Sequence, residues 1–294
     1  MPIPVPEYPV PAGPLAVRFT AYELLPMRAG TESLATVELE NAGTGILHAH
    51  GAGHIHLSYH WLDRLGNTIV WDGLRTPLAA PIPPGERAYA WLRIAVPRPP
   101  GPYRLAIDLI CEPRFWLSEL GNRPLEIDVD VLARLTRRAL AVHLSDGPAE
   151  LVAATRSALA AQEEPVASEG DATAFLGAGC APAPDWSRLV LDAHEEGYAA
   201  VAGSVAVQAG LLARAPAREL APWAPGFGRS PAWSLPLLCP SLLAELLPRA
   251  PWVEPVQGLP ALDPAGLDEP WLCDGRIRIT VPARALRPGD RRRA

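Results

Sequence analysis

The stretch Leu57-Ser58-Tyr59-His60-Trp61-Leu62-Asp63 alternates apolar and polar side chains, as a strand does when one of its faces packs on a core. Segments rich in Gly, Pro and Asn, such as Pro83-Pro84-Gly85-Glu86, occur at the spacing of turns. The same period of two recurs in residues 16–19, 34–40, 89–94, 103–109 and 125–131. Short alternating strands separated by such turns predict an antiparallel β-sandwich over residues 15–133.

Strands and helices alternate in the next part of the chain. The expected elements are strands at 140–144 and 172–176 and helices at 148–162 and 186–194. This order predicts a small α/β domain over residues 138–284, so the fold class is multidomain, β followed by α/β. Past residue 209 the prolines leave room for short elements, the clearest being a helix at 241–247 and a strand at 276–281.

The first residues form a proline-rich arm. Prolines at positions 2, 4, 6, 9, 11 and 14 exclude a helix and favour an extended chain over residues 1–14. We expect the arm to attach the protein to a partner, whose pockets would take the apolar side chains of Ile3, Val5, Tyr8 and Val10. A flexible leader is the alternative. Since no expected strand begins before Leu15, removal of residues 2–14 is predicted to leave both domains folded.

Charge and composition exclude several functions. The 294 residues carry a net charge of −6, and all 26 basic residues are arginine. Without lysine there is no P-loop lysine, Schiff-base lysine or Ser-Lys dyad. The positive charge gathers only in the Arg-rich tail, residues 285–294, at Arg287, Arg291, Arg292 and Arg293. We expect this tail to be solvated and the protein not to bind nucleic acid.

The sequence also predicts a location. No run of about 18 apolar residues is present, and residues 1–6 lack the basic start and apolar core of a secretion signal. A cytoplasmic protein is expected, either free or peripheral to a membrane complex. The four cysteines, at positions 111, 180, 239 and 273, contain no C-x-x-C pair. Reduced, mostly buried thiols are therefore predicted rather than a zinc site or a disulfide framework.

The first domain resembles a known class of sandwich. The segments that carry the resemblance are residues 28–30, 37–43, 57–63, 70–73, 84–86, 96–97 and 100–105. Together they resemble bacterial Ig-like domains attached to polysaccharide-export and glycosyltransferase proteins, and they are similar to the four-tryptophan domain of autophagy receptors. This resemblance implies an Ig-like fold and does not identify a ligand.

Three segments of the second domain, residues 140–148, 174–182 and 267–279, resemble in their order a shortened family 2 glycosyltransferase of the GT-A type. The resemblance implies that the second segment is the metal-site strand and that the third holds the acidic acceptor-side motif. If transferase activity were retained, Asp268 and Glu269 would supply the general base.

The departures from that family indicate lost activity. Gly177-Ala178-Gly179 stands where the family places its metal-binding aspartates, and none of these side chains offers an oxygen ligand. Between Gln162 and Asp171 there is no room for the strand and acidic loop that would hold the nucleotide. Without a metal the leaving diphosphate loses most of its charge stabilisation. The second domain is therefore predicted to be a pseudo-glycosyltransferase without a cofactor, and to bind no nucleotide sugar with manganese.

Histidines gather in one short segment of the first domain. His48, His50, His54 and His56, followed by His60, all have even numbers, so a continuous strand would place them on one face. Such H-x-H pairs can chelate zinc or copper. Gly51-Ala52-Gly53 is expected to break the strand, and no carboxylate lies within the segment. Ordinary exposed histidines are therefore the preferred interpretation, with these side chains as weak metal candidates.

Aromatic residues provide a candidate carbohydrate site. Tyr59, Trp61 and Trp71 are the main candidates, with Trp91 and Trp116 nearby in sequence. Alternation places Tyr59 and Trp61 on one face, which is either a sugar platform or the core. Tryptophan in a sandwich more often packs in the core, so Trp61 is predicted to be structural.

These observations favour a non-catalytic accessory or scaffolding subunit. Its sandwich and its pseudo-glycosyltransferase domain would present surfaces to protein partners in a larger assembly. The alternative is a glycosyltransferase or a carbohydrate-binding protein of cell-surface polysaccharide assembly, with a sugar as ligand.

Overall fold

The computed structural model divides the chain into two compact units, Met1–Leu132 and Ala133–Ala294. It describes residues 1–112, 115–208, 220–223, 228–230 and 234–286. Strand is the dominant secondary structure of a β-rich, multidomain protein. Within these ranges, none of the helices is both long and apolar enough to cross a membrane. The expected Arg-rich tail lies outside the described residues except for Ala285 and Leu286.

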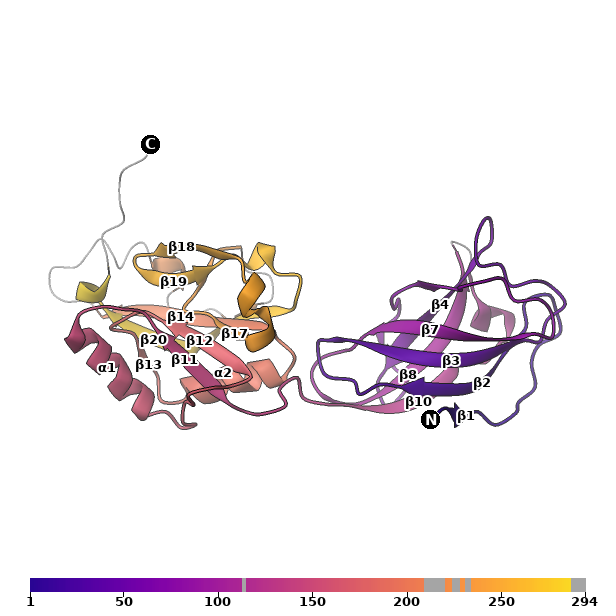
Figure 1. Cartoon of the computed structure of the whole chain (residues 1–294), viewed down its shortest axis with the longest axis horizontal. Helices are drawn as coiled ribbons and strands as arrows, with labels where there is room; N and C mark the ends of the chain where they lie inside the picture. The colour runs from indigo at the N-terminus through magenta and orange to yellow at the C-terminus, as the bar shows by residue number, and fades with distance from the viewer. Residues whose placement is uncertain (113–114, 209–219, 224–227, 231–233, 287–294) are drawn as a thin grey trace. The chain divides into compact units, whose positions relative to one another are not determined.

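Two antiparallel sheets form the first unit (Figure 1). The four-stranded sheet has the order β1 (Ile3–Pro4), β2 (Val17–Leu24), β3 (Glu32–Asn41) and β7 (Arg87–Ala95). The main path of the six-stranded sheet is β10 (Leu125–Val131), β8 (Gly101–Cys111), β4 (Ile55–Leu62) and β5 (Thr68–Val70). Its remaining strands are β6 (Thr76–Pro77), which pairs with β4, and β9 (Phe115–Trp116), which pairs with β8. Each sheet supplies one side of the first core.

The core of the first unit follows the predicted alternation. On β4 the odd-numbered residues Leu57, Tyr59 and Trp61 are buried between the sheets. Their partners on β8 are also odd-numbered, as in the pair Tyr59 and Ile107. Because side chains alternate across a strand, the inner faces of both strands are apolar throughout.

A mixed sheet forms the centre of the second unit. Its order is β11 (Leu140–Leu144), β12 (Ala172–Leu176), β17 (Ser241–Leu243), β14 (Ala200–Gln208), β20 (Trp271–Pro282) and β13 (Ala181–Pro182), with β15 (Arg229–Ser230) beside β20. Strand β11 runs parallel to β12, and β14 runs parallel to β20, whereas β17 is antiparallel to both of its neighbours. The strands β11, β12, β14 and β20 therefore all point the same way.

Different layers cover the two faces of this sheet. Figure 1 shows α1 (Ala149–Ala160) and α2 (Trp186–Glu195) on one side, and β19 (Leu259–Leu262) and β18 (Trp252–Val256) on the other. A short strand, β16 (Leu237–Leu238), completes this small three-stranded sheet. The 3-10 helices are Leu117–Leu120, Ala221–Trp223, Ala244–Arg249, Pro264–Gly266 and Ala283–Ala285.

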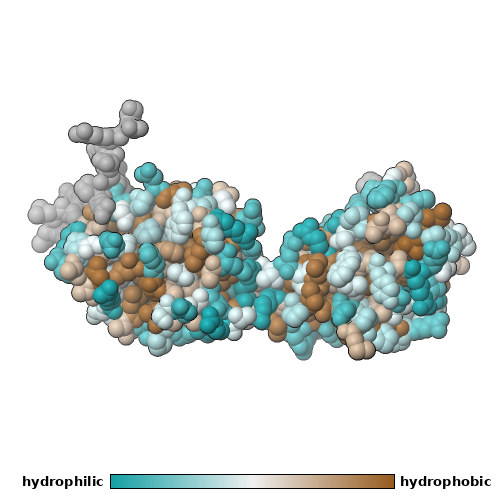
Figure 2. Space-filling model, in the orientation of Figure 1, coloured by the Kyte–Doolittle hydropathy of each residue, from teal (hydrophilic) through white to brown (hydrophobic). Residues whose placement is uncertain are grey.

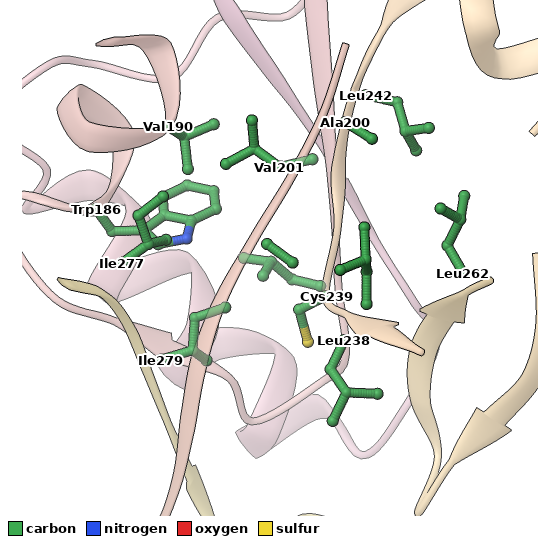
Figure 3. Packing of buried hydrophobic residues seen from close by; sticks show 14 of the residues in the cluster. Trp186, Val190, Ala200, Val201, Leu238, Cys239, Leu242, Leu262, Ile277 and Ile279 are labelled. Atoms are coloured by element: carbon green, nitrogen blue, oxygen red, sulfur yellow. The ribbon is translucent and has the colours of Figure 1, made fainter. Parts of the chain in front are cut away.

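Apolar side chains from these layers form the second core. In Figure 3, Trp186 and Val190 of α2 gather beside Val201 of β14 and Ile277 of β20. Figure 2 shows hydrophobic colour in separate areas on the visible face of each unit rather than across it. Most of the large apolar residues are thus used in the two cores, as burial of apolar surface requires.

Two elements of the second unit differ from the expectation. Strand β14 was not predicted, because its three valines are separated by alanine, glycine and serine, and glycine and alanine are depleted in strands. The helix predicted at 241–247 is wrong, since β17 and a 3-10 helix occupy it. Pro248 in that 3-10 helix has no amide hydrogen, which opposes a longer α-helix.

The arm is not free of the fold. Strand β1 pairs with the edge of β2, with Ile3 opposite Tyr22 and Pro4 opposite Ala21. The Val5 amide then donates a hydrogen bond of 2.8 Å to the Thr20 carbonyl. Prolines are tolerated here because an edge strand needs donors on only one side. The expectation that no strand begins before Leu15 is therefore wrong.

Candidate functional site

A pocket lies at the carboxyl ends of the parallel strands β11 and β12. His143 and Phe175 are register partners on these strands, and Ser145 follows β11. These three residues and Trp252 of β18 line a cavity of about 520 Å³, to which β19 also contributes. The carboxyl ends of parallel strands are common ligand sites in open α/β sheets. The volume is typical of small-molecule pockets, which span about 300–1,000 Å³.

Three rings in this pocket, His143, Phe175 and Trp252, form what we call the aromatic corner. The centroids of Phe175 and Trp252 are 4.6 Å apart with an interplanar angle of 70°. The rings of His143 and Phe175 are 5.5 Å apart. Pairing with Leu262 of β19 holds Trp252 in place, although its side chain is partly exposed. Edge-to-face rings leave faces on which a flat or ring-shaped ligand can stack.

The pocket has few polar side chains, namely those of His143 and Ser145. The Ser145 hydroxyl accepts a hydrogen bond of 3.3 Å from the Ala178 amide, and the Ser145 amide donates to the Leu176 carbonyl. This hydroxyl can still donate its proton to a ligand. Among the described lining residues there is no carboxylate and no arginine. The pocket therefore suits an uncharged ligand better than a nucleoside diphosphate.

The glycine turn after β12 is filled by the chain itself. A side chain at Gly177 would meet Leu259 Cδ2 at 3.1 Å, and one at Gly179 would meet Ala285 Cβ at 2.7 Å. Gly179 also has φ of +94°, and its amide donates a 2.9 Å hydrogen bond to the Thr155 hydroxyl. Within the described ranges, no group of three or more His, Cys, Asp or Glu side chains has a metal-binding arrangement.

Asp268 and Glu269 lie at the other edge of the sheet. They precede β20, whereas the pocket follows β11 and β12, and all three strands run the same way. Glu269 pairs with Arg134 and Arg249, each at 3.3 Å. The Arg134 side chain is nearly buried and also contacts Glu245 at 2.5 Å. The structure thus places Glu269 in an ion-pair cluster and does not bring the acidic pair to the pocket.

The cysteines are buried and form no disulfide. The sulfurs of Cys180 and Cys239 are 3.9 Å apart behind the glycine turn. The hydrogen bond that the Cys239 thiol shares with Cys180, together with burial, raises the pKa of the Cys239 thiol well above its ordinary value. Such a thiol stays protonated and unreactive near neutral pH, in agreement with the prediction of buried thiols.

The candidate sugar-binding residues separate into two groups. Tyr59 and Trp61 lie in the core, where the Ala95 amide donates to the Tyr59 hydroxyl at 2.7 Å and Trp61 Nε1 donates to the Ala95 carbonyl at 2.9 Å. Neither ring is accessible to a sugar. Trp71, by contrast, is exposed on the outer side of the six-stranded sheet.

The histidine segment does not come together as a whole. His48 and His50 are exposed and precede β4, which begins at Ile55 after the Gly51 and Gly53 turns. Only His54 and His56 are in ring contact, with centroids 4.6 Å apart. Burial, followed by the nearby His54, lowers the pKa of His56. The fifth histidine of the segment, His60, is buried against Trp71 instead.

The arm residues contact their own unit. Ile3 is exposed, Val5 packs on the first core and Val10 is half-buried. The Tyr8 hydroxyl accepts a 2.8 Å hydrogen bond from the Phe19 amide, and the Arg123 guanidinium lies 5.5 Å from the Tyr8 ring. Burial raises the pKa of Tyr8, so the hydroxyl stays protonated. Of the four proposed contact residues, Ile3 is the most available to a partner.

Sequence reasoning did not select the aromatic corner. His143 and Phe175 were assigned only to strands, and Trp252 lies between prolines in a part where short elements were expected. One signal was present, because His143 and Phe175 occupy the same position within two strands of equal length. Parallel pairing of those strands makes the two rings neighbours, but Trp252 is brought to them only by the tertiary fold.

No family model matches the sequence, and no curated protein matches it. Among solved structures, the C-terminal domain of Wzt is 8% identical, with a TM-score of 0.29, and the match covers 40% of this chain and 75% of that one. A family 123 glycoside hydrolase from Clostridium perfringens is 12% identical with a TM-score of 0.24, covering 44% of this chain and 26% of that one. The putative ApaA protein from Bordetella pertussis is 17% identical with a TM-score of 0.19, and the match covers 40% of this chain and 92% of that one. These weak, partial likenesses carry no argument about function.

Proposed function

We propose that this protein is a non-catalytic accessory subunit whose second unit binds a ligand without transforming it. One observation carries the proposal: the ligand-sized pocket and the acidic pair lie at opposite edges of the same sheet. A general base must come within hydrogen-bond reach of the group it deprotonates. Asp268 and Glu269 therefore have no role in chemistry at the aromatic corner.

The origin of the second unit is part of the proposal. We infer a shortened, degenerate GT-A-like domain, which is supported by the strand, helix, strand order of β11, α1 and β12 and by the glycine turn that follows. An Ig-like class for the first unit is supported by its two antiparallel sheets. On this view the turn Gly177-Ala178-Gly179 lost its metal ligands, and Leu259 of β19 fills the space beside it.

A surface for protein partners is available on the first unit. On the outer face of the four-stranded sheet, Leu34 of β3 and Tyr89 and Trp91 of β7 are all exposed. Tyr89 and Trp91 are two residues apart, so their side chains lie on the same face of β7. Tyrosine and tryptophan are enriched in interfaces because they bury large areas at low entropic cost. We assign to this face the contact with the larger assembly.

Calorimetric titration tests the absence of transferase function. Full-length protein is titrated with uridine, guanosine and thymidine diphosphate sugars in the presence of manganese. We expect no saturable binding, because the described pocket lining offers no carboxylate to hold manganese and no arginine to pair with a diphosphate. Saturable, metal-dependent binding in the micromolar range would contradict the proposal.

The partner surface is tested with a matched pair of exposed tryptophans. Tagged full-length protein is isolated from its native cells and its complex is sized. Trp91→Ala is expected to release the assembly, whereas Trp71→Ala, on the other sheet, is expected to retain it. Equal retention by wild type and Trp91→Ala would remove the proposed surface.

A further inference from the structure

A buried polar layer covers the outer side of the six-stranded sheet. The even-numbered residues of β4 and β8 point away from the first core, yet Ser58, His60 and Asp108 are almost fully buried. Ser58 and Asp108 are direct cross-strand partners. Outward-facing polar residues of a sandwich are usually solvated. Something therefore covers these three residues.

The cover consists of residues 71–75 and Trp116. The Trp71 ring stacks on His60 with centroids 4.3 Å apart and an angle of 28°, and Trp116 contacts the same imidazole at 4.3 Å. His60 Nδ1 also makes a hydrogen bond with the Trp71 carbonyl. The Gly73 amide donates a 2.9 Å hydrogen bond to the Tyr59 carbonyl. A side chain at Gly73 would lie 2.6 Å from that oxygen, so glycine is required for this close approach.

Trp71 is held in place but remains accessible. Its residue is 55% exposed, even though its ring is stacked on His60. Trp91 is 64% exposed, and within the described ranges no ring stacks on it. A fixed ring loses little conformational freedom when a ligand stacks on it, so its order favours binding. If the Trp71 side chain served only to pack on His60, it would not need to be this exposed to solvent.

Hydrogen-bonded polar side chains belong to the same cover as Trp71. Arg75 donates from Nε to Glu112 at 2.6 Å, from Nη2 to Asp72 at 3.0 Å and from Nη1 to Ser58 at 2.8 Å. Its guanidinium carbon also lies 4.8 Å from the centre of the Trp116 ring. Asp72 remains largely exposed, and its carboxylate has lone pairs that Arg75 does not use. These groups are held beside the platform rather than pointing freely into solvent.

We propose that Trp71 is the stacking platform of a carbohydrate site, and that it takes an uncharged pyranose with Asp72 accepting hydrogen bonds from its hydroxyls. A pyranose presents an apolar face to an aromatic ring and a rim of hydroxyl donors to a carboxylate. Arg75 is paired with two carboxylates, those of Asp72 and Glu112, so among the described residues this cluster offers no free positive charge for an anionic sugar. The site belongs to the first unit and does not rest on the function proposed for the second.

An oligosaccharide array with neutral, uronic-acid and sulfated members tests this site on the full-length protein. We expect retention by neutral members only. In a titration with a retained neutral oligosaccharide, Trp71→Ala is expected to weaken binding at least tenfold. Asp72→Asn keeps the size of the side chain but removes the carboxylate, and it is expected to weaken binding several-fold. The matched control Trp91→Ala is expected to bind as the wild type does.

Three outcomes would overturn the proposal. They are no retention of any neutral oligosaccharide, retention of charged members alone, and equal loss of binding in Trp71→Ala and Trp91→Ala. If Trp71→Ala does not fold, Asp72→Asn decides, because the Asp72 side chain is largely exposed. Unchanged affinity in a folded Asp72→Asn protein would then reject the site.

Discussion

Trp61 connects the two sheets of the first unit. Its indole is fully buried between β4 and β7, and Nε1 donates to the Ala95 carbonyl at 2.9 Å. Tyr59 accepts from the amide of the same residue, so both outward groups of Ala95 on β7 are satisfied from the opposite sheet. Trp61 therefore contributes both apolar burial and a hydrogen bond that compensates for an otherwise unpaired strand edge.

Replacement of Trp61 by alanine is expected to cost about 3–5 kcal/mol of unfolding free energy, as for other buried aromatics. Urea unfolding of the first unit, followed by circular dichroism, measures this change. Trp91→Ala, which truncates an exposed tryptophan on β7 of the opposite sheet, is the control and should change stability by less than about 0.5 kcal/mol. If Trp61→Ala unfolds at the wild-type urea concentration, the structural role of Trp61 is refuted.

His194 is a buried neutral base in the second unit. Its Nδ1 lies 2.8 Å from the Tyr198 carbonyl and its Nε2 lies 2.9 Å from the Ser241 hydroxyl. Burial lowers the pKa of His194 from 6.5 to about 4. The imidazole therefore stays neutral in the folded protein under conditions where the unfolded chain takes up a proton.

The free energy of unfolding should consequently decrease as the pH is lowered, because the unfolded chain binds a proton at His194 that the folded protein does not bind. The contribution of neutral His194 is complete above pH 6.5, and it is lost as the pH falls from 6.5 towards 4. At pH 5 the loss is about 2 kcal/mol relative to pH 7.5, because the unfolded state alone is protonated. Urea unfolding of wild type and His194→Gln at both pH values measures it. A pH dependence that is the same in both proteins would contradict this assignment.

At the level of elements, β1 adds the proline-rich arm to an exposed sheet edge. Besides this pairing, four hydrogen bonds hold the arm: the Val5 amide donates to the Thr20 carbonyl, the Phe19 amide donates to the Tyr8 hydroxyl, and the amides of Thr44 and Gly45 donate to the carbonyls of Gly13 and Pro14. The arm also encloses a cavity of about 270 Å³ beside Arg123. Its role in attaching a partner stays a prediction, but the arm also belongs to the fold of its own unit.

Deletion of residues 2–14 is expected to leave the first unit folded but less stable by about 4 kcal/mol, given about 1 kcal/mol for each of these four hydrogen bonds. Tyr8→Phe removes only the hydroxyl acceptor of the Phe19 amide and should cost about 1 kcal/mol. Urea midpoints of the three proteins give the comparison. A truncated protein as stable as the wild type would show that β1 does not stabilise the sandwich.

At the level of the whole molecule, the two units have separate hydrophobic cores. The first core draws its buried residues from positions 17–131, and the second from positions 135–286. Each is built from elements of its own unit, and the division falls between Leu132 and Ala133. A domain with its own core is able to fold alone.

A fragment of residues 1–132 is therefore expected to fold without the rest of the chain. On heating, the fragment should unfold cooperatively, with a midpoint close to that of the first unit in the full protein. Its amide NMR signals should be dispersed. The matched truncation, residues 1–112, lacks β10 and should not fold, since β10 pairs with β8 along its whole length. A broad, non-cooperative transition of the longer fragment would argue against autonomous folding.

Local periodicity accounts for how much of the fold could be predicted. The alternation in residues 57–63 and 125–131 predicted β4 and β10, because period two is a property of neighbouring residues and needs no distant contact. Helix α2 was predicted to within one residue at its carboxyl end for the same reason. Strand β14 was missed, since small residues in a central strand are stabilised by partners far away in sequence.

The sequence by itself determined what chemistry the side chains exclude: no lysine for covalent catalysis, and no oxygen ligand in Gly177-Ala178-Gly179. Only the tertiary structure decided which aromatic residues are accessible. Trp61 of β4 and Trp71, which directly follows β5, are ten positions apart, yet the first is fully buried and the second is exposed, because strand pairing and the cover over β4 set their surroundings. It likewise decided that Glu269 pairs with Arg134, away from the pocket. Residue chemistry is a local property, whereas burial and proximity arise from long-range pairing of strands.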